Sequence, residues 1–378
     1  MITIAEKNPR IRLFVPDQNR LEGDALQQLC KTAELPGMQS VAAMPDLHPG
    51  KGGPVGAAFL TRQVFYPHLI GSDVGCGMGF YLTDLRKNKA KRDKWAKKLR
   101  GLEEIWEGDP VRWLQKYSLE TADYIEALGT IGGGNHFAEL QIVEEVRDAE
   151  SFAALGLDKN RLMLLVHSGS RGLGASLLRK HTDVFGAGSL EEGSEKAGIY
   201  LEKHGEALGW ARANRALIAH RFLSLLGSEG NEILDVSHNS VSRVTYEGKK
   251  GWLHRKGVVV SDRGPVIIPG TRGSLSYLVK PEGEQESNLR SLAHGAGRKW
   301  NRRSVKGRLK DRYHAKSLMQ TEMGGIVICE DKNLLYEEAP PAYKNIDRVI
   351  QDMADEGLIQ IVAAFRPLIT YKMRDTAR

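Results

Sequence analysis

Seven short segments, all but one of them rich in glycine, constrain the fold of this chain more than any other feature of its sequence. Glycine lets the backbone turn tightly and approach a ligand closely, and each segment also holds polar residues that can carry chemistry. Five of the seven contain a histidine. The segments are MPDLHPGKGGPVGAAF (44–59), GSDVGCGMGF (71–80), GTIGGGNHF (129–137), HSGSRG (167–172), DVSHNS (235–240), PGTRGSLSY (269–277) and AHGAGRKW (293–300).

One of these segments holds a carboxylate and a thiol that can face the same metal ion. Asp73 and Cys76 are three positions apart in a single turn, and three histidines lie at strand ends or in turns elsewhere: His136, His167 and His238. This donor set suits a divalent ion of borderline softness, because carboxylate favours harder ions, thiolate softer ones and imidazole those between. Zinc-finger and HExxH spacings are absent. Spacing alone therefore leaves a metal site and a metal-free glycine turn equally open.

Two further segments can bind phosphate groups. His294 is flanked by small residues that leave room for a bulky group on its imidazole, and Arg298 can hold a phosphoryl oxygen. An imidazole can act as a base, a metal ligand or a nucleophile, and the sequence does not choose among them. The three glycines before Asn135 and His136 can present backbone N–H groups to a phosphate. The alternative is a turn that only connects two strands.

The charge balance is compatible with a polyanionic partner. Lys plus Arg number 54 and Asp plus Glu 47, which gives a net charge of +7, and the segment 298–312 is strongly basic. This segment can follow a nucleic-acid backbone, with Trp300 as a stacking ring. A solvated helix face is the simpler interpretation of the same residues.

The cysteines and the apolar runs indicate the compartment. Cys30, Cys76 and Cys329 are too few for a disulfide framework, which favours a reducing environment. The N-terminal residues contain no apolar stretch typical of a signal peptide, and no run of about 18 apolar residues occurs. We therefore expect a cytoplasmic location and no membrane span.

Apolar runs and amphipathic stretches mix without the regular alternation of a doubly wound sheet, which predicts an α+β fold. No shift in composition marks a boundary, so we expect one domain over residues 1–378. Strands are predicted at 57–65, 79–85, 161–169, 257–261, 266–270 and 324–330. Helices are predicted at 91–106, at 196–227 with Gly227 as a C-terminal cap, and at 345–357.

Taken together, the motifs resemble the RtcB family of RNA-splicing ligases. DVGCGM, GGGNHF, HSGSRG, SHN and HGAGR occur here in the family's order, and the resemblance extends from residue 44 to the end of the chain. The segments 337–346 and 366–372 also look like the family's C-terminal part. Each motif alone is weak evidence for the family, whereas the five motifs in this order are very specific to it.

The resemblance implies an α+β fold with sheets stacked around a deep central cleft and helices at the periphery. It implies GTP- and Mn²⁺-dependent joining of an RNA 2′,3′-cyclic phosphate or 3′-phosphate end to a 5′-hydroxyl end, in RNA repair or tRNA splicing. One or two Mn²⁺ ions would bind, and GTP would react to leave GMP on His294 before an RNA-ppG intermediate forms. Archease or a release-factor homologue would be the candidate protein partners.

The resemblance also implies a role for particular residues. The metal ligands would be Asp73, Cys76, His136, His167 and His238, with Asp73 shared between two ions. The catalytic residues would be His294, Asp46, which orients His294, and Arg298. The guanylate pocket would include Asn135, Phe137, Glu139, Asn239, Thr271, Ser276, Ala296, Gly297, Tyr343 and Lys372.

The sequence departs from the family's pattern in places, and two other functions stay open. Thr271 and Arg272 stand where relatives often have Ser-Met, Leu292 and Ala293 where they often have polar residues or cysteine, and the chain is shorter than many relatives. One alternative is a metal-dependent cyclic phosphodiesterase that processes RNA ends without ligation and does not require His294. The other is a non-catalytic RNA-binding or chaperone-like protein, which leaves the ordered motifs unexplained.

Overall fold

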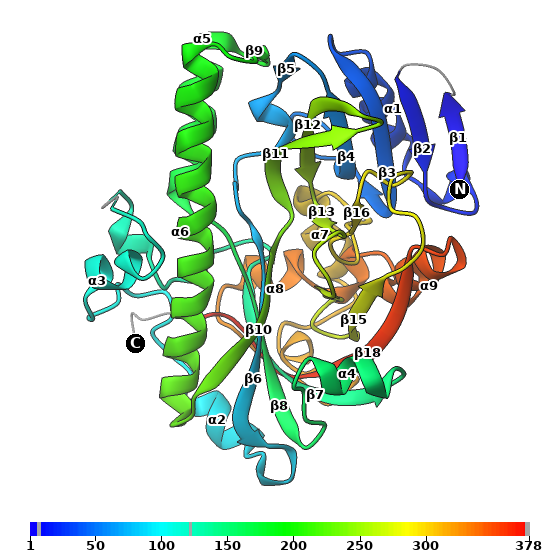
Figure 1. Cartoon of the computed structure of the whole chain (residues 1–378). Helices are drawn as coiled ribbons and strands as arrows, with labels where there is room; N and C mark the ends of the chain where they lie inside the picture. The colour runs from blue at the N-terminus through cyan, green and yellow to red at the C-terminus, as the bar shows by residue number, and fades with distance from the viewer. Residues whose placement is uncertain (6–8, 121–122, 375–378) are drawn as a thin grey trace.

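Strands of the described chain form two large sheets, and helices cover them on the outside (Figure 1). The computed structural model describes residues 1–5, 9–120 and 123–374. Within these residues one large sheet has six strands and the other has eight, and the remaining strands form two small pairs. The pairs are β13 (Val258–Val260) with β16 (Ser291–Ala293), and β5 (Val64–Phe65) with β9 (Leu190–Glu191). The predicted α+β class is confirmed.

The six-stranded sheet is built mainly from the first part of the chain. The strands lie in the order β1 (Ile2–Ala5), β2 (Arg10–Leu13), β3 (Met38–His48), β4 (Val55–Thr61), β12 (Lys249–Lys256) and β11 (Asn239–Tyr246). Helix α1 (Gly23–Ala33) packs its buried face, which includes Leu29, against Val41 and Phe59 of β3 and β4. The last residues of β3 include Asp46 and His48, so this sheet delivers both side chains to the centre of the molecule.

The eight-stranded sheet joins the middle of the sequence to its last described strand. Its order is β10 (Gly230–Ser237), β6 (Gly77–Arg86), β8 (Arg161–Ser168), β7 (Phe137–Val146), β18 (Ile359–Met373), β15 (Ser276–Pro281) and β14 (Val266–Ile268), with β17 (Ile326–Cys329) parallel to β18. Strand β18 therefore lies inside the sheet, between β7 and β15. The pairing sets His167 opposite Met78 on one side and Phe137 on the other.

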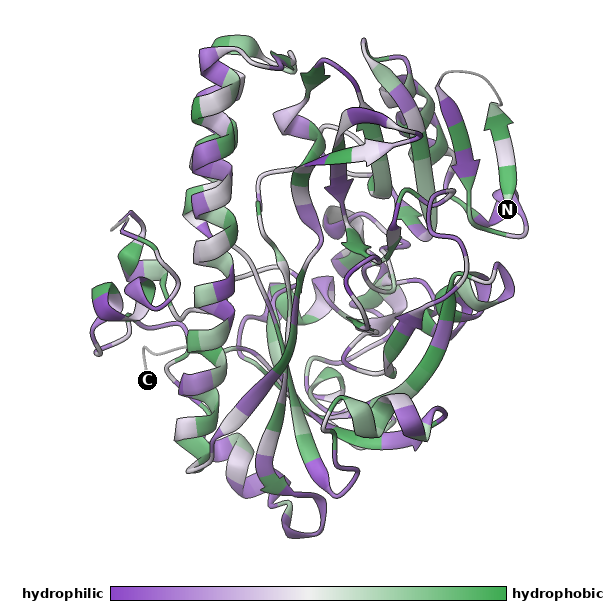
Figure 2. Ribbon diagram, in the orientation of Figure 1, coloured by the Kyte–Doolittle hydropathy of each residue, from purple (hydrophilic) through white to green (hydrophobic). Residues whose placement is uncertain are grey.

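All six predicted strands are present, as β4 with β5, β6, β8, β13, β14 and β17. Strand β18 was not predicted from apolar runs, although 14 of its 15 residues are buried or half-buried. Gln360, Arg366, Pro367 and Lys372 interrupt its apolar residues. No continuous apolar run therefore indicates this strand, although it is paired on both edges. Figure 2 shows it as mainly hydrophobic along its length.

Two of the three predicted helices are confirmed. Helix α6 (Glu195–Leu226) begins at Ser194, whose hydroxyl accepts from the Ala197 N–H, and ends at Gly227 in the left-handed conformation. It packs along β6, β8 and β10 (Figure 1). Helix α9 (Ile346–Asp355) ends just before Gly357. None of the described helices combines the length and the apolar character needed to cross a membrane.

The helix predicted at 91–106 is wrong over most of its length. Helix α2 covers only Arg92–Lys98, because Leu99 takes an extended conformation and Gly101 a positive φ. This turn directs Leu99 and Leu102 into the core beside β8, and their burial outweighs the helical pattern of the following residues. The other helices are α3 (Pro110–Gln115), α4 (Ala149–Ala154), α5 (Gly172–Phe185), α7 (Arg302–Leu309) and α8 (Lys332–Glu337).

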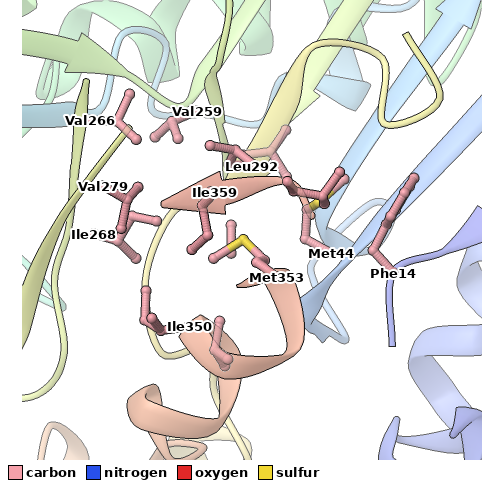
Figure 3. Packing of buried hydrophobic residues seen from close by; sticks show 14 of the residues in the cluster. Phe14, Met44, Val259, Val266, Ile268, Val279, Leu292, Ile350, Met353 and Ile359 are labelled. Carbon is pink, nitrogen blue, oxygen red and sulfur yellow. The ribbon is translucent and has the colours of Figure 1, made fainter. Parts of the chain in front are cut away.

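The core between the two large sheets is continuous with α9. Ile350 and Met353 of α9 point toward Ile359, Ile268 and Val279 of the eight-stranded sheet (Figure 3). Each such fully buried aliphatic side chain contributes about 1.5–3 kcal/mol relative to an exposed one. This packing joins the two large sheets and α9 in one core.

Candidate active site

A cavity of about 320 Å³ lies where the two large sheets meet. His48, Val55 and Lys256 line it from the six-stranded sheet, and Met78 and Thr370 from the eight-stranded sheet. The turns that contain the glycine-rich motifs close the remaining sides. The central cleft between sheets, implied by the resemblance, is therefore present.

Most of the residues singled out from the sequence converge on this cavity. Three of them lie directly behind its wall instead: Asp46, His136 and Ser276. Those that line it are Asp73, Cys76, Asn135, Phe137, Glu139, His167, His238, Asn239, Thr271, His294, Ala296, Gly297, Arg298, Tyr343 and Lys372. Segments up to about 300 positions apart in the sequence thus share one site.

Cys76, His136 and His167 form a buried group whose ligand atoms all lie within 4.8 Å of one another. The Cys76 Sγ is 3.3 Å from His136 Nε2 and 3.2 Å from His167 Nε2. Asp73 joins this group, since its Oδ2 lies 2.9 Å from His136 Nε2. Three classes of donor, thiol, imidazole and carboxylate, therefore meet at one point.

Backbone carbonyls orient the two imidazoles. The Nδ1 of His136 lies 3.1 Å from the Ile131 carbonyl oxygen, and the Nδ1 of His167 lies 3.1 Å from that of Asn135. A carbonyl only accepts, so each Nδ1 carries a proton and each Nε2 is turned toward Cys76. This is how metal-binding histidines are held in proteins, by a hydrogen bond from the nitrogen that does not bind the metal.

His238 connects this donor group to His294. Its ring centroid is 5.2 Å from that of His167 and 4.8 Å from that of His294. The main chain places it there, because the His238 N–H donates to the Cys76 carbonyl at 2.8 Å. The Nδ1 of His238 and the Oδ1 of Asp73 are buried and have no hydrogen-bond partner among the described residues. Such orphaned polar atoms are costly unless a ligand or water satisfies them.

Two glycines make the turn between Asp73 and Cys76 possible. Gly75 has a φ of +74°, a conformation that side chains rarely adopt, and a Cβ there would also lie 2.9 Å from the Ala211 side chain. Gly169 leaves room for the Asp73 carboxylate, which would approach a Cβ at that position to 2.1 Å. The sequence GSDVGC followed by HSG thus encodes close packing of two turns around one carboxylate.

A buried ion pair beneath the donor group fixes both turns. Arg215 of α6 forms a bidentate pair with Asp235 of β10, at 2.6 Å for each contact, and both side chains are buried. The same guanidinium donates to the Gly75 carbonyl at 2.7 Å and the Ser168 carbonyl at 2.9 Å. These carbonyls belong to the residues adjacent to Cys76 and His167, so Arg215 positions two of the donors. Nothing in its helical sequence context predicted this role.

Asp46, on β3 of the six-stranded sheet, orients His294 through two hydrogen bonds. Its Oδ2 lies 2.7 Å from His294 Nδ1 and accepts the main-chain N–H of His294 at 3.2 Å. Asp46 is fully buried, and His48 stacks against His294 with ring centroids 6.4 Å apart. The Nε2 of His294 is therefore the nitrogen left for chemistry.

Burial controls the protonation of these groups. It lowers the pKa of His48 to about 4 and holds the pKa values of His167 and His238 well below the ordinary value, so these imidazoles are neutral. Burial, and then the Asp73 carboxylate, raises the pKa of the Cys76 thiol well above its ordinary value. Burial opposes ionisation of Asp73, but its contacts with His136 hold the pKa of the carboxyl below its usual range.

One end of the cavity carries a buried carboxyl and a buried amine. Gln141 donates through its Nε2 to Glu139 at 2.8 Å and to Ser276 Oγ at 3.0 Å, and the Lys372 amine donates to the His136 carbonyl at 3.0 Å. Burial raises the pKa of Glu139 to about 7 and lowers that of Lys372 to about 8. Both groups change charge readily near neutral pH.

Arg298 and Asn239 are engaged by protein groups. The Arg298 guanidinium donates to Glu338 at 3.0 Å, to the Tyr343 hydroxyl at 3.1 Å and to the Glu337 carbonyl at 2.9 Å. The Asn239 side chain joins the Asp73 carbonyl, at 3.0 Å, to the Gly257 N–H, at 2.9 Å. Both residues line the cavity, and the predicted binding of a phosphoryl oxygen by Arg298 stays a prediction.

Some cavity residues were not singled out from the sequence. Lys256 lies in the wall and donates to the carbonyls of Lys51 and Gly53 at 2.9 and 3.1 Å, and burial lowers its pKa to about 8. His48 and Arg302 also line the cavity. His48 lies two residues after Asp46 in the glycine-rich segment 44–59, and this proximity could have indicated it as a site residue. No local signal distinguishes Lys256 from other lysines.

Buried thiol, imidazole and carboxylate donors beside an oriented histidine are typical of a metal-dependent enzyme. A family model described as tRNA-splicing ligase RtcB matches residues 28–119 and 106–373. The chain therefore belongs to the RtcB ligase family, which confirms the prediction of an enzyme of this family. It is 50% identical over 93% of both chains to an RNA-splicing ligase RtcB2 of Escherichia coli, and 30% identical, over 97% of this chain and 95% of the relative, to a tRNA-splicing ligase RtcB of Nanoarchaeum equitans.

Proposed function

We propose that this protein is a GTP- and Mn²⁺-dependent RNA ligase that joins 2′,3′-cyclic phosphate or 3′-phosphate ends to 5′-hydroxyl ends. One observation carries the proposal. His294, oriented by Asp46, lies with its ring 4.8 Å from that of His238, beside the donor group of Asp73, Cys76 and His167. The proposed nucleophile and the proposed cation site would thus share one cavity.

The donor residues fit a divalent ion such as Mn²⁺. Asp73, Cys76, His136, His167 and His238 would hold one or two ions, with Asp73 between them. The orphaned Asp73 Oδ1 and His238 Nδ1 support this fit, since a cation would satisfy both. When bound, the metal would stabilise negative charge on the transferring phosphoryl group and favour the Cys76 thiolate.

His294 would act as the nucleophile. Because Asp46 accepts a hydrogen bond from Nδ1–H, the lone pair of His294 lies on Nε2. Attack of Nε2 on the α-phosphorus of GTP forms a P–N bond and breaks the bond to the β-phosphate bridging oxygen, so pyrophosphate leaves. The imidazole becomes cationic in this step, and the buried Asp46 carboxylate stabilises that charge.

Ligation would then take two transfers. The RNA 3′-phosphate attacks the guanylyl phosphorus, which breaks the P–N bond and yields RNA-ppG. The RNA 5′-hydroxyl attacks the activated 3′-phosphorus and releases GMP as the new phosphodiester forms. A cyclic phosphate end is first hydrolysed to a 3′-monophosphate. The roles proposed for Asn135, Phe137, Glu139, Thr271, Ser276, Ala296, Gly297, Tyr343 and Lys372 are in binding the guanylate.

A basic surface beside the cavity supports RNA as the substrate. Helix α7 exposes Lys306 and Arg308, and Arg308 lies over the Trp300 ring at 5.3 Å. Arg302, at the start of the helix, reaches the cavity and lies 3.4 Å from the Asn135 side-chain oxygen. Cations leading from a surface into a cavity suit a nucleic-acid strand whose end enters the site.

We also propose a domain organisation, a cellular location and partner proteins for this enzyme. Residues 1–378 would act as one ligase domain in the cytoplasm, in RNA repair or tRNA splicing, with archease or a release-factor homologue as an accessory protein.

The test is covalent labelling. Incubation of the purified protein with α-³²P-GTP and Mn²⁺ should give a labelled protein band that survives denaturation, and His294→Ala should abolish it. His314→Ala, which changes an exposed histidine, is the matched control and should label normally. A broken stem-loop RNA with a cyclic phosphate then separates the two enzyme functions. Joined strands support ligation, whereas a 3′-phosphate end alone, without protein labelling, indicates the cyclic phosphodiesterase.

A further inference from the structure

Strand β3 bulges at the point where it delivers Asp46 to the active site. In its described pairing with β4, residues 44–47 lie opposite Gly56 alone. Gly56 fits there because it has no side chain: its φ is +92°, and a Cβ would lie 2.8 Å from the main chain of Leu47. Such bulges redirect a side chain, and they leave main-chain groups without partners in the sheet.

The side chain of Lys344 supplies partners for these main-chain groups. Its Nζ donates to the Leu47 carbonyl at 2.5 Å and lies 3.5 Å from the Pro45 carbonyl oxygen. Pro45 and Leu47 are both buried, and they flank Asp46 on either side. The Glu22 carboxylate, 3.0 Å from the same Nζ, balances the charge. The three donors of the ammonium thus meet three acceptors.

The main chain of Lys344 holds the other half of the Asp46–His294 pair. Its N–H donates to the Gly297 carbonyl at 3.0 Å. Gly297 lies in the HGAGR turn that carries His294, and a Cβ on it would lie 2.3 Å from the Asp46 carbonyl oxygen. Lys344 therefore bonds the strand that carries the carboxylate and the turn that carries the imidazole.

The side-chain contacts are the part that requires a lysine. Any residue except proline can donate a main-chain N–H to Gly297, whereas the contacts with the bulge need a long side chain that ends in several donors. Asp46 lies between the two carbonyls that Lys344 contacts. A shift of the bulge would therefore move the Asp46 carboxylate relative to His294 Nδ1, which it meets at 2.7 Å.

We propose that Lys344 is a positioning residue whose ammonium fixes the β3 bulge, so that Asp46 keeps His294 oriented for attack on the nucleotide. This proposal rests on the proposed function, in which His294 is the nucleophile. Lys344 is not among the described residues that line the cavity, so it would act through Asp46 rather than on the substrate. Misplacement of a reacting group by about 1 Å can cost roughly 100-fold in rate.

The test compares the rate of labelling with the affinity for nucleotide. Lys344→Met keeps the apolar stem and removes the ammonium. Single-turnover labelling with saturating α-³²P-GTP and Mn²⁺ should be about 10- to 100-fold slower than in the wild type. Affinity is measured by calorimetry with a GTP analogue that has a methylene group between the α- and β-phosphates and so cannot release pyrophosphate. This affinity should stay close to that of the wild type.

A double-mutant cycle asks whether Lys344 acts through Asp46. Lys344→Met should slow labelling in the wild-type background much more than in the Asp46→Asn background, because the carboxylate that it positions is absent from the second. Lys203→Met is the matched control. It removes the exposed partner of Glu206 on α6 and should label at the wild-type rate.

Thermal unfolding without nucleotide checks that each variant is folded. Lys344→Gln keeps a polar side chain at this position but lacks the charge and the reach of lysine. It takes the place of Lys344→Met in every measurement if the methionine variant does not fold, and the same results are expected of it.

Three outcomes would overturn the assignment while the wild type is labelled normally. The Lys344 variants could label at the wild-type rate. They could bind the analogue more weakly yet react normally at saturating GTP, which would make Lys344 part of nucleotide binding. They could also slow both backgrounds by the same factor, which would make its role independent of Asp46. If the wild type itself takes up no label, the proposed function fails, and this assignment fails with it.

Discussion

One carboxylate oxygen of Asp46 accepts two hydrogen bonds from His294, one from the ring Nδ1 at 2.7 Å and one from the main-chain N–H at 3.2 Å. These bonds link the six-stranded sheet, which carries Asp46, to the HGAGR turn. They fix both the tautomer and the rotation of the imidazole. The reactivity of His294 should therefore depend on a residue 248 positions away.

Asp46→Asn should slow the labelling of His294 by GTP. The amide can occupy the same space, but it carries no charge to stabilise the cationic imidazole and can hold the wrong tautomer. We expect a decrease of roughly 10²- to 10⁴-fold in the guanylylation rate, by analogy with other Asp–His pairs. Single-turnover labelling at saturating GTP measures it. An unchanged rate would mean that Asp46 only supports the turn.

Cys76→Ala should remove Mn²⁺ binding. The Sγ lies within 3.3 Å of two imidazole nitrogens, so its loss opens the centre of the donor group. Changes to residues around metal ligands alone cost 10- to 100-fold in affinity, and we expect at least about 100-fold here. Titration calorimetry with Mn²⁺ measures it. Cys30→Ala, in α1, is the control and should bind Mn²⁺ normally. Tight binding by the Cys76 variant would contradict the site.

Arg215→Met should destabilise the fold and weaken the donor group together. It leaves Asp235 buried without its partner, which costs about 3–5 kcal/mol, and it releases the carbonyls of Gly75 and Ser168. Arg212→Met, one turn away on α6, breaks an exposed pair with Glu232 and should cost at most about 1 kcal/mol. Urea denaturation compares the free energies of unfolding, and equal losses would refute the assigned role.

Glu139→Gln should change how stability depends on pH. Burial raises the pKa of this carboxyl from 4.5 to about 7, so between these values the folded protein holds a proton that the unfolded chain has released. The wild type therefore loses stability as pH rises through this window, by roughly 3 kcal/mol in total. The glutamine variant lacks this loss. Its free energy of unfolding relative to wild type should rise between pH 4.5 and 7.5. If the free energies of unfolding of the two proteins instead follow parallel curves against pH, the raised pKa of Glu139 is excluded.

The site was more predictable from sequence than the elements around it. Asp73 and Cys76 are close in sequence, and the short polar segments singled out from the sequence include His136, His167 and His238. Their convergence could not be derived from spacing, since it depends on how β6, β7, β8 and β10 pair. The ordered family motifs supplied that missing information.

Long-range contacts explain what the sequence did not reveal. Arg215 lies in a helix whose pattern gives no reason to expect a bond to Gly75, because that bond depends on how α6 crosses the sheet. Helix α2 is shorter than its local pattern predicts, because Leu99 and Leu102 gain more from burial than from continued helix. In both cases tertiary packing overrides local sequence.

The place of β18 inside its sheet has a consequence for how the protein is made. Strand β7 can pair with β8, and β15 with β14, before residue 359 is synthesised, but the other edge of each stays unpaired until β18 enters between them. A ribosome-bound chain that stops short of this strand presents two unpaired sheet edges, which are sites of aggregation. It also lacks Thr370 and Lys372 in the cavity wall. A chain that ends before this strand lacks part of the cavity wall, so activity should begin only after this strand has left the ribosome.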